Sequence, residues 1–147
     1  MTRTFGQVAC AALLLAAGYG AGRLAGADAV VNAQAQRARV FELRTYTVSE
    51  GKLGALHSRF RDHTVKLFEK HGMKNIGYWT PREPPLSQNT LIYIVAHESP
   101  EAARASWTAF RNDTDWLKAR TASEVDGKLA GKVESIYLDP TDYSPMK

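Results

Sequence analysis

The order of hydrophobic periodicities along residues 40–138 constrains the fold more than any other feature of this chain. Residues 40–48 alternate with a period of two, which indicates a β-strand. Residues 53–71 repeat at spacings of three and four, which indicates an amphipathic helix. The same reading predicts strands at 75–80, 90–98 and 132–138, and a helix from 100 that is broken or re-capped at 112–114 and continues to 124. This β-α-β-β-α-β order predicts an α+β, ferredoxin-like domain with a four-stranded antiparallel sheet.

One face of such a sheet is covered by helices, and the other is left open. Strand 90–98 is apolar on both faces, so the open face carries either Tyr93 and Val95 or Ile92 and Ile94, depending on the register. Either pair is too apolar to leave in water. We therefore expect a second copy of the chain, related by a two-fold axis, to cover the open face and form a homodimer.

Residues 1–35 have the pattern of a signal peptide. Arg3 precedes a short apolar run, and Ala33-Gln34-Ala35 is a small-x-small cleavage site, with an earlier alternative at 25–27. The run is shorter than the roughly 20 residues of a spanning helix. We expect export to the periplasm or the outside of the cell, a short linker at 36–39 and a mature domain at 40–147. The alternative is an uncleaved membrane anchor at residues 8–22.

The composition of the mature part excludes several kinds of site. Cys10 lies in the leader, so the mature chain has no thiolate for a disulfide, a zinc site or a nucleophile. After the leader, 17 basic and 14 acidic residues remain, a net charge of +3. The basic residues are scattered, and we expect no nucleic-acid partner. The sequence has no metal-ligand motif and no phosphate-binding loop, so no cofactor is evident from the residues.

Several segments, taken in order, resemble one known family. They are 41–47 with 51–53, 68–73 with 77–79, 115–116, and 138–145. Together they resemble the NIPSNAP family of the dimeric α/β barrel superfamily, over nearly all of residues 40–147. The resemblance implies a ferredoxin-like protomer whose sheet packs face to face with that of a second copy. Family members are associated with mitochondrial surfaces and vesicle traffic. This chain differs from them in its predicted export signal.

The first strand carries a polar trio with two interpretations. Glu42, Arg44 and Tyr46 share one strand face, and if Phe41 and Leu43 face the helices, the trio points into the barrel or the dimer interface. A buried Arg44 needs a carboxylate, supplied by Glu42 or, on the last strand, by Glu134. The trio is either an ion pair that fixes the dimer register or a site at which Arg44 recognises an anion beside the Tyr46 hydroxyl.

The four histidines, His57, His63, His71 and His97, form no motif. His71 precedes Gly72, where an imidazole can bond the last helix carbonyls. His63 lies at the edge of the predicted sheet-facing surface. Because pockets of the superfamily lie between helices and sheet, His63 is our candidate catalytic base or axial haem ligand, haem being suggested by superfamily analogy alone.

Aromatic residues are numerous for a domain of this size. Most are expected in the core, but Trp79, Tyr93 and Trp107 are also candidates to line an apolar pocket. Three functions remain open. The chain binds a small apolar or aromatic molecule, it is a cofactor-free or haem-related monooxygenase of the superfamily type, or it is a scaffold whose outer helices dock a protein partner.

Overall fold

A computed structural model describes residues 39–147, and the predicted leader lies outside these residues. The four strands are β1 (Val40–Val48), β2 (Lys74–Trp79), β3 (Thr90–His97) and β4 (Ala130–Leu138). The first helical segment comprises α2 (Leu53–Arg59), a π-helical turn η1 (Phe60–Thr64) and α3 (Val65–Lys70). The others are the short α4 (Leu86–Asn89), then α5 (Pro100–Asn112) and α6 (Thr114–Ser123). Each strand begins and ends within two residues of the prediction.

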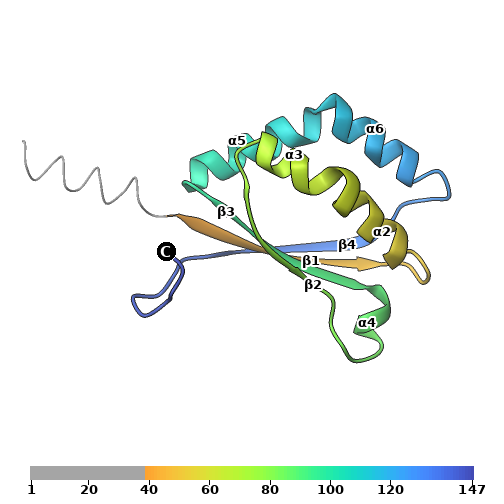
Figure 1. Cartoon of the computed structure of the whole chain (residues 1–147), viewed down its shortest axis with the longest axis horizontal. Helices are drawn as coiled ribbons and strands as arrows, with labels where there is room; N and C mark the ends of the chain where they lie inside the picture. Colours follow the sequence, from red (N-terminus) through yellow and green to blue (C-terminus); the bar gives the residue numbers. More distant parts are fainter. Residues whose placement is uncertain (1–38) are drawn as a thin grey trace, which may run out of the picture. The chain divides into compact units, whose positions relative to one another are not determined.

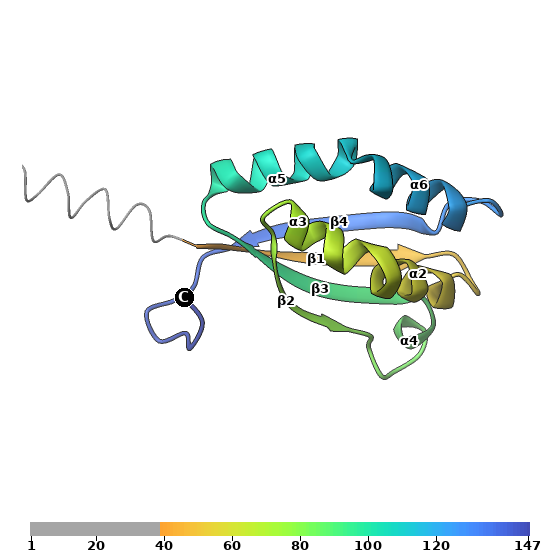
Figure 2. The same ribbon diagram turned by 45° about the horizontal axis from the view of Figure 1, so that its top comes forward.

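The four strands form one antiparallel sheet in the order β2-β3-β1-β4. Strand β1 is central and pairs with β3 on one side and β4 on the other, with Arg44 opposite both Tyr93 and Ser135. The helices α2 to α3 and α5 to α6 lie together on one side of this sheet, as Figures 1 and 2 show from two directions. The predicted ferredoxin-like α+β fold is confirmed.

The register decides which strand residues face the helices, and it does not meet the condition under which the polar trio would point into the barrel or the dimer interface. Glu42 hydrogen-bonds Trp107 of α5, and the Tyr46 ring lies 5.7 Å from that of Phe60 in η1. Glu42, Arg44 and Tyr46 therefore face the helices, and Phe41 and Leu43 face the open side. The reason is that Trp107 and its neighbours give the polar side chains partners that strand periodicity alone does not reveal.

Aromatic rings form much of the core between sheet and helices. Phe68, which is 1% exposed, lies at the centre of this core. Its ring centroid is 4.9 Å from that of Phe110, 5.3 Å from Trp107 and 5.8 Å from Tyr93. The contacts with Phe110 and Trp107 are edge-to-face, and such contacts add to the stabilisation from area burial. Tyr93, on the central strand β3, is fully buried under the helices and belongs to this core.

The long first helix contains a π-helical turn that its sequence periodicity did not predict. At this turn the hydroxyl of Thr64 donates to the carbonyl of Arg59 at 3.2 Å. Arg59 is buried, bonds Glu124 beyond α6 at 2.9 Å, and stacks over Trp116 at 5.1 Å. The wider turn thus coincides with the point where this helix is tied to α6. π-Helical turns occur frequently at functional sites. In this protein the turn follows directly after Arg59, whose ion pair with Glu124 is structural.

The ends of the helices follow the predicted signals, with one difference. Gly72 has a φ of +76°, which allows the chain to leave α3, and Ser99 caps α5 by accepting from the Ala102 amide. Asp113 caps α6 by accepting from two backbone amides at 2.7 and 3.2 Å. The His71 side chain does not bond the helix carbonyls, since Asp113, 2.7 Å from its Nε2, gives the ring a charged partner across the helices.

The open face of the sheet retains exposed apolar side chains. Trp79 is 50% exposed, Ile136 56% and Leu138 41%, and the central Ile92 and Ile94 are half-buried. Of the two sequence alternatives, Ile92 and Ile94 thus occupy the open face. The C-terminal residues after β4 lie on this side, away from the helices (Figure 2). Within residues 39–147 no helix is long and apolar enough to cross a membrane.

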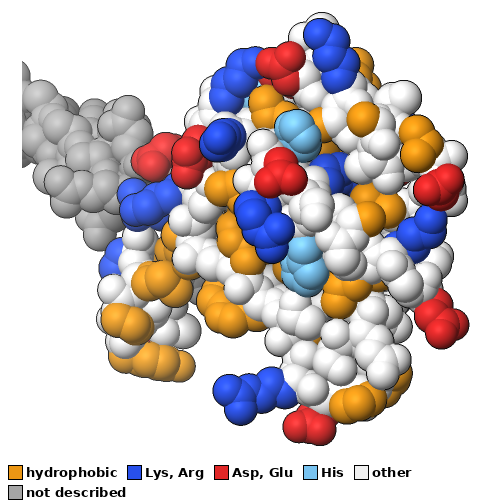
Figure 3. Space-filling model, turned by 45° about the vertical axis from the view of Figure 1, so that its right-hand side comes forward, with side chains coloured by type: hydrophobic (Ala, Val, Ile, Leu, Met, Phe, Trp, Pro, Cys, Tyr) orange, Lys and Arg blue, Asp and Glu red, His pale blue; other side chains and the backbone are white. Residues whose placement is uncertain are grey.

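Acidic and basic side chains are interspersed on the surface seen in Figure 3, with apolar side chains between them. That face carries no extended patch of a single charge.

Candidate functional site

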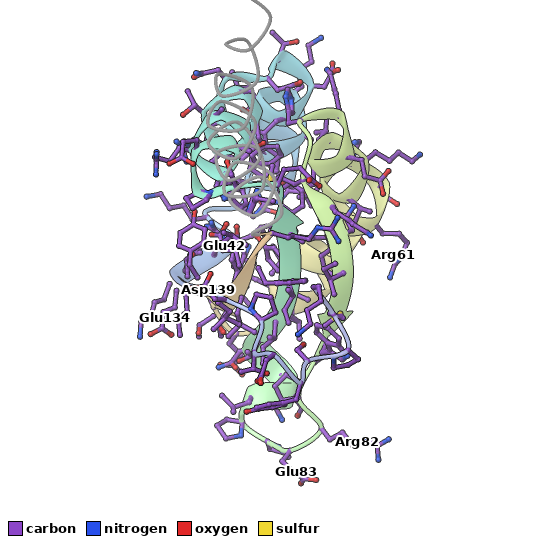
Figure 4. All side chains as sticks on the ribbon, turned by 90° about the vertical axis from the view of Figure 1, so that its left-hand side faces the viewer. Glu42, Arg61, Arg82, Glu83, Glu134 and Asp139 are labelled. Carbon is purple, nitrogen blue, oxygen red and sulfur yellow. The ribbon has the colours of Figure 1, made fainter. Side chains whose placement is uncertain are left out.

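The Glu42 carboxylate is the centre of a buried polar cluster between the sheet and α5. It is 1% exposed and accepts four hydrogen bonds, two at each oxygen. Arg44 (2.8 Å) and Ser135 (2.5 Å) donate to Oε1, and Trp107 (2.5 Å) and His97 (3.0 Å) bond Oε2. Three strands and one helix therefore converge on one carboxylate. Figure 4 shows Glu42 beneath the helices.

These partners determine the charge of the cluster. Burial raises the pKa of Glu42, but the hydrogen bonds from His97, Ser135 and Trp107, with the charge of Arg44, outweigh burial and lower the pKa to about 2. Glu42 is thus ionised at neutral pH and is a poor proton acceptor. The cluster is suited to holding a charge in place rather than to removing a proton from a substrate.

Arg44 is held by the cluster on one side only. Its NH1 donates to Glu42, and its guanidinium stacks 4.2 Å from the centroid of the Trp107 ring and 5.8 Å from that of Tyr46. Burial lowers the pKa of Arg44, but Tyr93, Tyr46 and Glu42 more than offset this and raise the pKa. Its Nε atom is buried and has no hydrogen-bond partner among residues 39–147. Arg44 therefore has a free donor in an oriented side chain.

Two members of the cluster, His97 and Ser135, had no role in the sequence analysis. Both follow from the sheet register. Ser135 is the cross-strand partner of Arg44, and His97 lies two residues along β3 from Val95, the partner of Glu42. Side chains at such positions share a face and come within reach of each other. The strand pairing would therefore have identified both, but the sequence alone did not fix it.

The structure separates the predicted site residues into two groups. Glu42, Arg44 and Trp107 meet in the cluster, and the hydroxyls of Tyr46 and Tyr93 lie 3.4 Å apart beside it. Trp79 is on the open side of edge strand β2, and His63 is exposed on η1. Figure 4 shows Arg61, on the same turn, projecting away from the sheet.

Glu134 is not a partner of Arg44. It pairs with Thr45 across β1 and β4, so it faces the open side, and its carboxylate bonds Lys132 at 2.9 Å. Figure 4 shows Glu134 pointing outward from β4, well separated from Glu42. Ser135, the next residue along β4, lies opposite Arg44 instead of Glu134.

The helix-facing side of β4 is left uncovered next to Arg44. Val133, Ser135 and Tyr137 lie on this side, opposite Tyr46, Arg44 and Glu42 respectively, and all three are exposed. We call these three residues the β4 shelf. Because the Arg44 side chain is itself 18% exposed, a small molecule lying on the shelf can reach it.

A separate depression of about 560 Å³ lies at the turn after β1 and the end of α4, and it contains none of the predicted site residues. It is lined by Glu50, Gly51, Pro85, Gln88 and Asn89. Among residues 39–147, no three His, Cys, Asp or Glu side chains are grouped to hold a metal ion.

The sequence profile of the NIPSNAP family matches residues 41–145. This chain belongs to the NIPSNAP family. The match spans β1 to the tail after β4 and therefore includes every residue of the Glu42 cluster. No curated protein matches the chain.

Solved structures show the same fold at low sequence identity. A NIPSNAP family protein of unknown function from Agrobacterium tumefaciens is 22% identical, with a TM-score of 0.65, over 76% of this chain and 96% of its own. A NIPSNAP-like domain protein from Burkholderia xenovorans is 16% identical, with a TM-score of 0.64, over 74% and 90%. SnoaB from Streptomyces nogalater, a cofactor-independent oxygenase, is 18% identical, with a TM-score of 0.51, over 74% and 98%. NIPSNAP proteins thus share their fold with an oxygenase, and the likeness extends to the fold alone.

Proposed function

We propose that this NIPSNAP protein is an exported homodimer that binds a small aromatic or apolar molecule beside Arg44. The observation that carries the binding proposal is the combination of an oriented arginine with an uncovered shelf. Glu42 and Trp107 fix the position of Arg44, while Val133 and Tyr137 leave apolar surface accessible next to it. A few fixed polar groups beside apolar and aromatic side chains are typical of small-molecule sites.

Binding is a better account of this cluster than catalysis by a base. Burial raises the pKa of Glu42, but its four hydrogen-bond partners outweigh burial and lower the pKa to about 2. Glu42 is therefore unsuited to take a proton. His63, the base proposed from the sequence, is exposed on η1 and is not among the hydrogen-bond partners of Glu42. The oxygenase alternative is therefore supported by the fold, but neither Glu42 nor His63 is suited to act as its general base.

The homodimer is supported by the open face of the sheet. Its exposed apolar side chains include Trp79, Ile136 and Leu138, beside the half-buried Ile92 and Ile94. A contiguous apolar face of this kind is rare on monomeric proteins unless it serves an interaction. A second copy packed on it would bury these side chains without covering the β4 shelf, which lies on the opposite face.

Native mass spectrometry of the full chain, purified from the cells that produce it, tests both parts. We expect twice the mass of the processed chain, with N-terminal residue Gln36 and an additional retained small molecule. Ile136→Lys should halve the mass, whereas Val125→Lys, at a 77% exposed position outside the sheet, should leave the dimer intact. A wild-type protein that is monomeric at micromolar concentration would refute the dimer, and an intact Met1 on a membrane pellet would refute cleavage.

A further inference from the structure

The unused side of the Arg44 guanidinium indicates what class of molecule the site takes. Arginine has five N–H donors, and its side-on edge, formed by Nε and NH2, matches the two oxygens of a carboxylate. In this protein NH1 is occupied by Glu42 and one planar face by Trp107. The side-on edge remains, and its buried Nε has no acceptor among residues 39–147.

Glu42 does not need this edge. Its two oxygens already accept from four donors, three of which are His97, Trp107 and Ser135. Arg44 is thus oriented by Glu42 through NH1, while its buried Nε is left without an acceptor among residues 39–147. A buried donor without an acceptor costs free energy, and an arriving acceptor removes that cost.

The surroundings of Arg44 favour a flat, aromatic ligand. Trp107 and Tyr46 border the guanidinium, and Val133 and Tyr137 of the β4 shelf are 42% and 51% exposed next to it. Burial and the negative charge of Glu42 raise the pKa of Tyr137, and the positive charges of Arg44 and Arg104 offset only part of this, so the ring on the shelf is neutral. Aromatic surface and the Arg44 guanidinium therefore lie next to each other.

We propose that the ligand of this site is a planar aromatic carboxylate, whose carboxylate accepts from Nε and NH2 of Arg44 while its ring lies on the β4 shelf. This inference rests on the proposed small-molecule site and specifies its chemistry. The acid is bound and not transformed, so no bond to it is made or broken.

Matched probes separate the acid from the ring. Titration calorimetry of the dimeric full-length protein is carried out with 2-naphthoate and with its neutral analogue 2-naphthamide. We expect naphthoate to bind at least about tenfold more tightly, as a bidentate charge-assisted contact requires. In Arg44→Met the preference should disappear. Tyr137→Ala should weaken both probes by a similar factor, and Tyr143→Ala, 84% exposed in the tail, should change neither.

A second measurement does not depend on any variant folding. The ¹⁵Nε–¹Hε resonance of Arg44 in the wild-type protein should shift on addition of naphthoate and remain unchanged with naphthamide. Equal affinities and an unmoved resonance would overturn the carboxylate inference and leave a small-molecule site without charge selection. Absence of binding by both probes up to millimolar concentration, with no retained adduct in the native mass spectrum, would overturn the proposed site as well.

Discussion

Replacing Glu42 by glutamine isolates the charge of the buried cluster. The glutamine amide has nearly the same shape, but it has one oxygen and one NH2 group in place of two acceptors. Ser135 and His97 can reorganise, since a hydroxyl can rotate and an imidazole can change tautomer. Arg44 and Trp107 can only donate, and they bond different oxygens of Glu42. Whichever way the amide is turned, one of these two donors loses its acceptor.

The lowered pKa of Glu42 gives the magnitude. Its pKa is lowered from 4.5 to about 2, because the hydrogen bonds from its partners outweigh the opposing effect of burial. One pKa unit corresponds to about 1.4 kcal/mol, so the lowered pKa of Glu42 contributes about 3 kcal/mol to the free energy of unfolding at neutral pH. Because the pKa of Glu42 is lower in the folded state than its ordinary value of 4.5, this stabilisation is fully present at pH values above 4.5. It is lost as the pH falls toward 2. About 2 kcal/mol of it should be lost between pH 6 and pH 3.

We therefore expect Glu42→Gln to lower the free energy of unfolding by about 3 kcal/mol at pH 7 and by only about 1 kcal/mol at pH 3. The measurement is urea unfolding followed by tryptophan fluorescence from pH 3 to pH 7, at one fixed protein concentration because the proposed dimer links stability to concentration. Glu134→Gln, on the open face with an exposed Lys132 partner, is the matched control and should change stability by less than about 0.5 kcal/mol. A difference between wild type and Glu42→Gln that is constant over this pH range would refute the argument, since the carboxylate would then have an ordinary pKa.

Three further substitutions test the packing and the helix ends by the same unfolding assay. Phe68→Ala should cost about 3–5 kcal/mol, because a 1% exposed ring in contact with four other aromatic rings is removed, and a loss below about 1 kcal/mol would contradict its central position. Ser99→Ala should cost about 1 kcal/mol through loss of the hydrogen bond to the Ala102 amide, and an unchanged midpoint would show that this cap does not stabilise α5. Gly72→Ala should cost about 1 kcal/mol from its φ of +76° alone, since the added Cβ would lie 3.7 Å from Ser106 Oγ without a clash; a much larger loss would indicate crowding that this distance does not predict.

The order of elements was predictable because it depends on local periodicity. The alternation in 40–48 and the spacing of three and four in 53–71 are properties of neighbouring residues, and both elements form where expected. The side of β1 that faces the helices was not predictable in this way. Phe41 and Leu43 are more apolar than Glu42 and Arg44, so hydrophobicity taken alone favours the opposite orientation, and the sequence left the register open. Burial of the polar pair depends on Trp107, 65 positions along the chain from Glu42.

The same limit applies to individual side chains. The sequence identified Glu42 as the partner of Arg44, because the two are adjacent on one strand face, but offered Glu134 as an alternative where the register brings Ser135. It placed His71 at a helix end correctly but could not foresee Asp113, which lies 42 residues away. Contacts between distant elements require the strand pairing and helix packing to be known.

The polarity of the Glu42 cluster is itself an argument for a role beyond folding. A buried ion pair can often be replaced by well-packed apolar residues without loss of stability, because desolvation offsets much of the attraction between the charges. The neighbouring space under the helices is filled by aromatic and aliphatic side chains, so an apolar solution was available at this position too. Glu42 and Arg44 interrupt that core where it borders the uncovered β4 shelf, opposite Tyr137 and Ser135. A charge kept ionised by four hydrogen bonds, orienting an arginine beside an exposed surface, therefore supports the proposed binding role over a purely structural one.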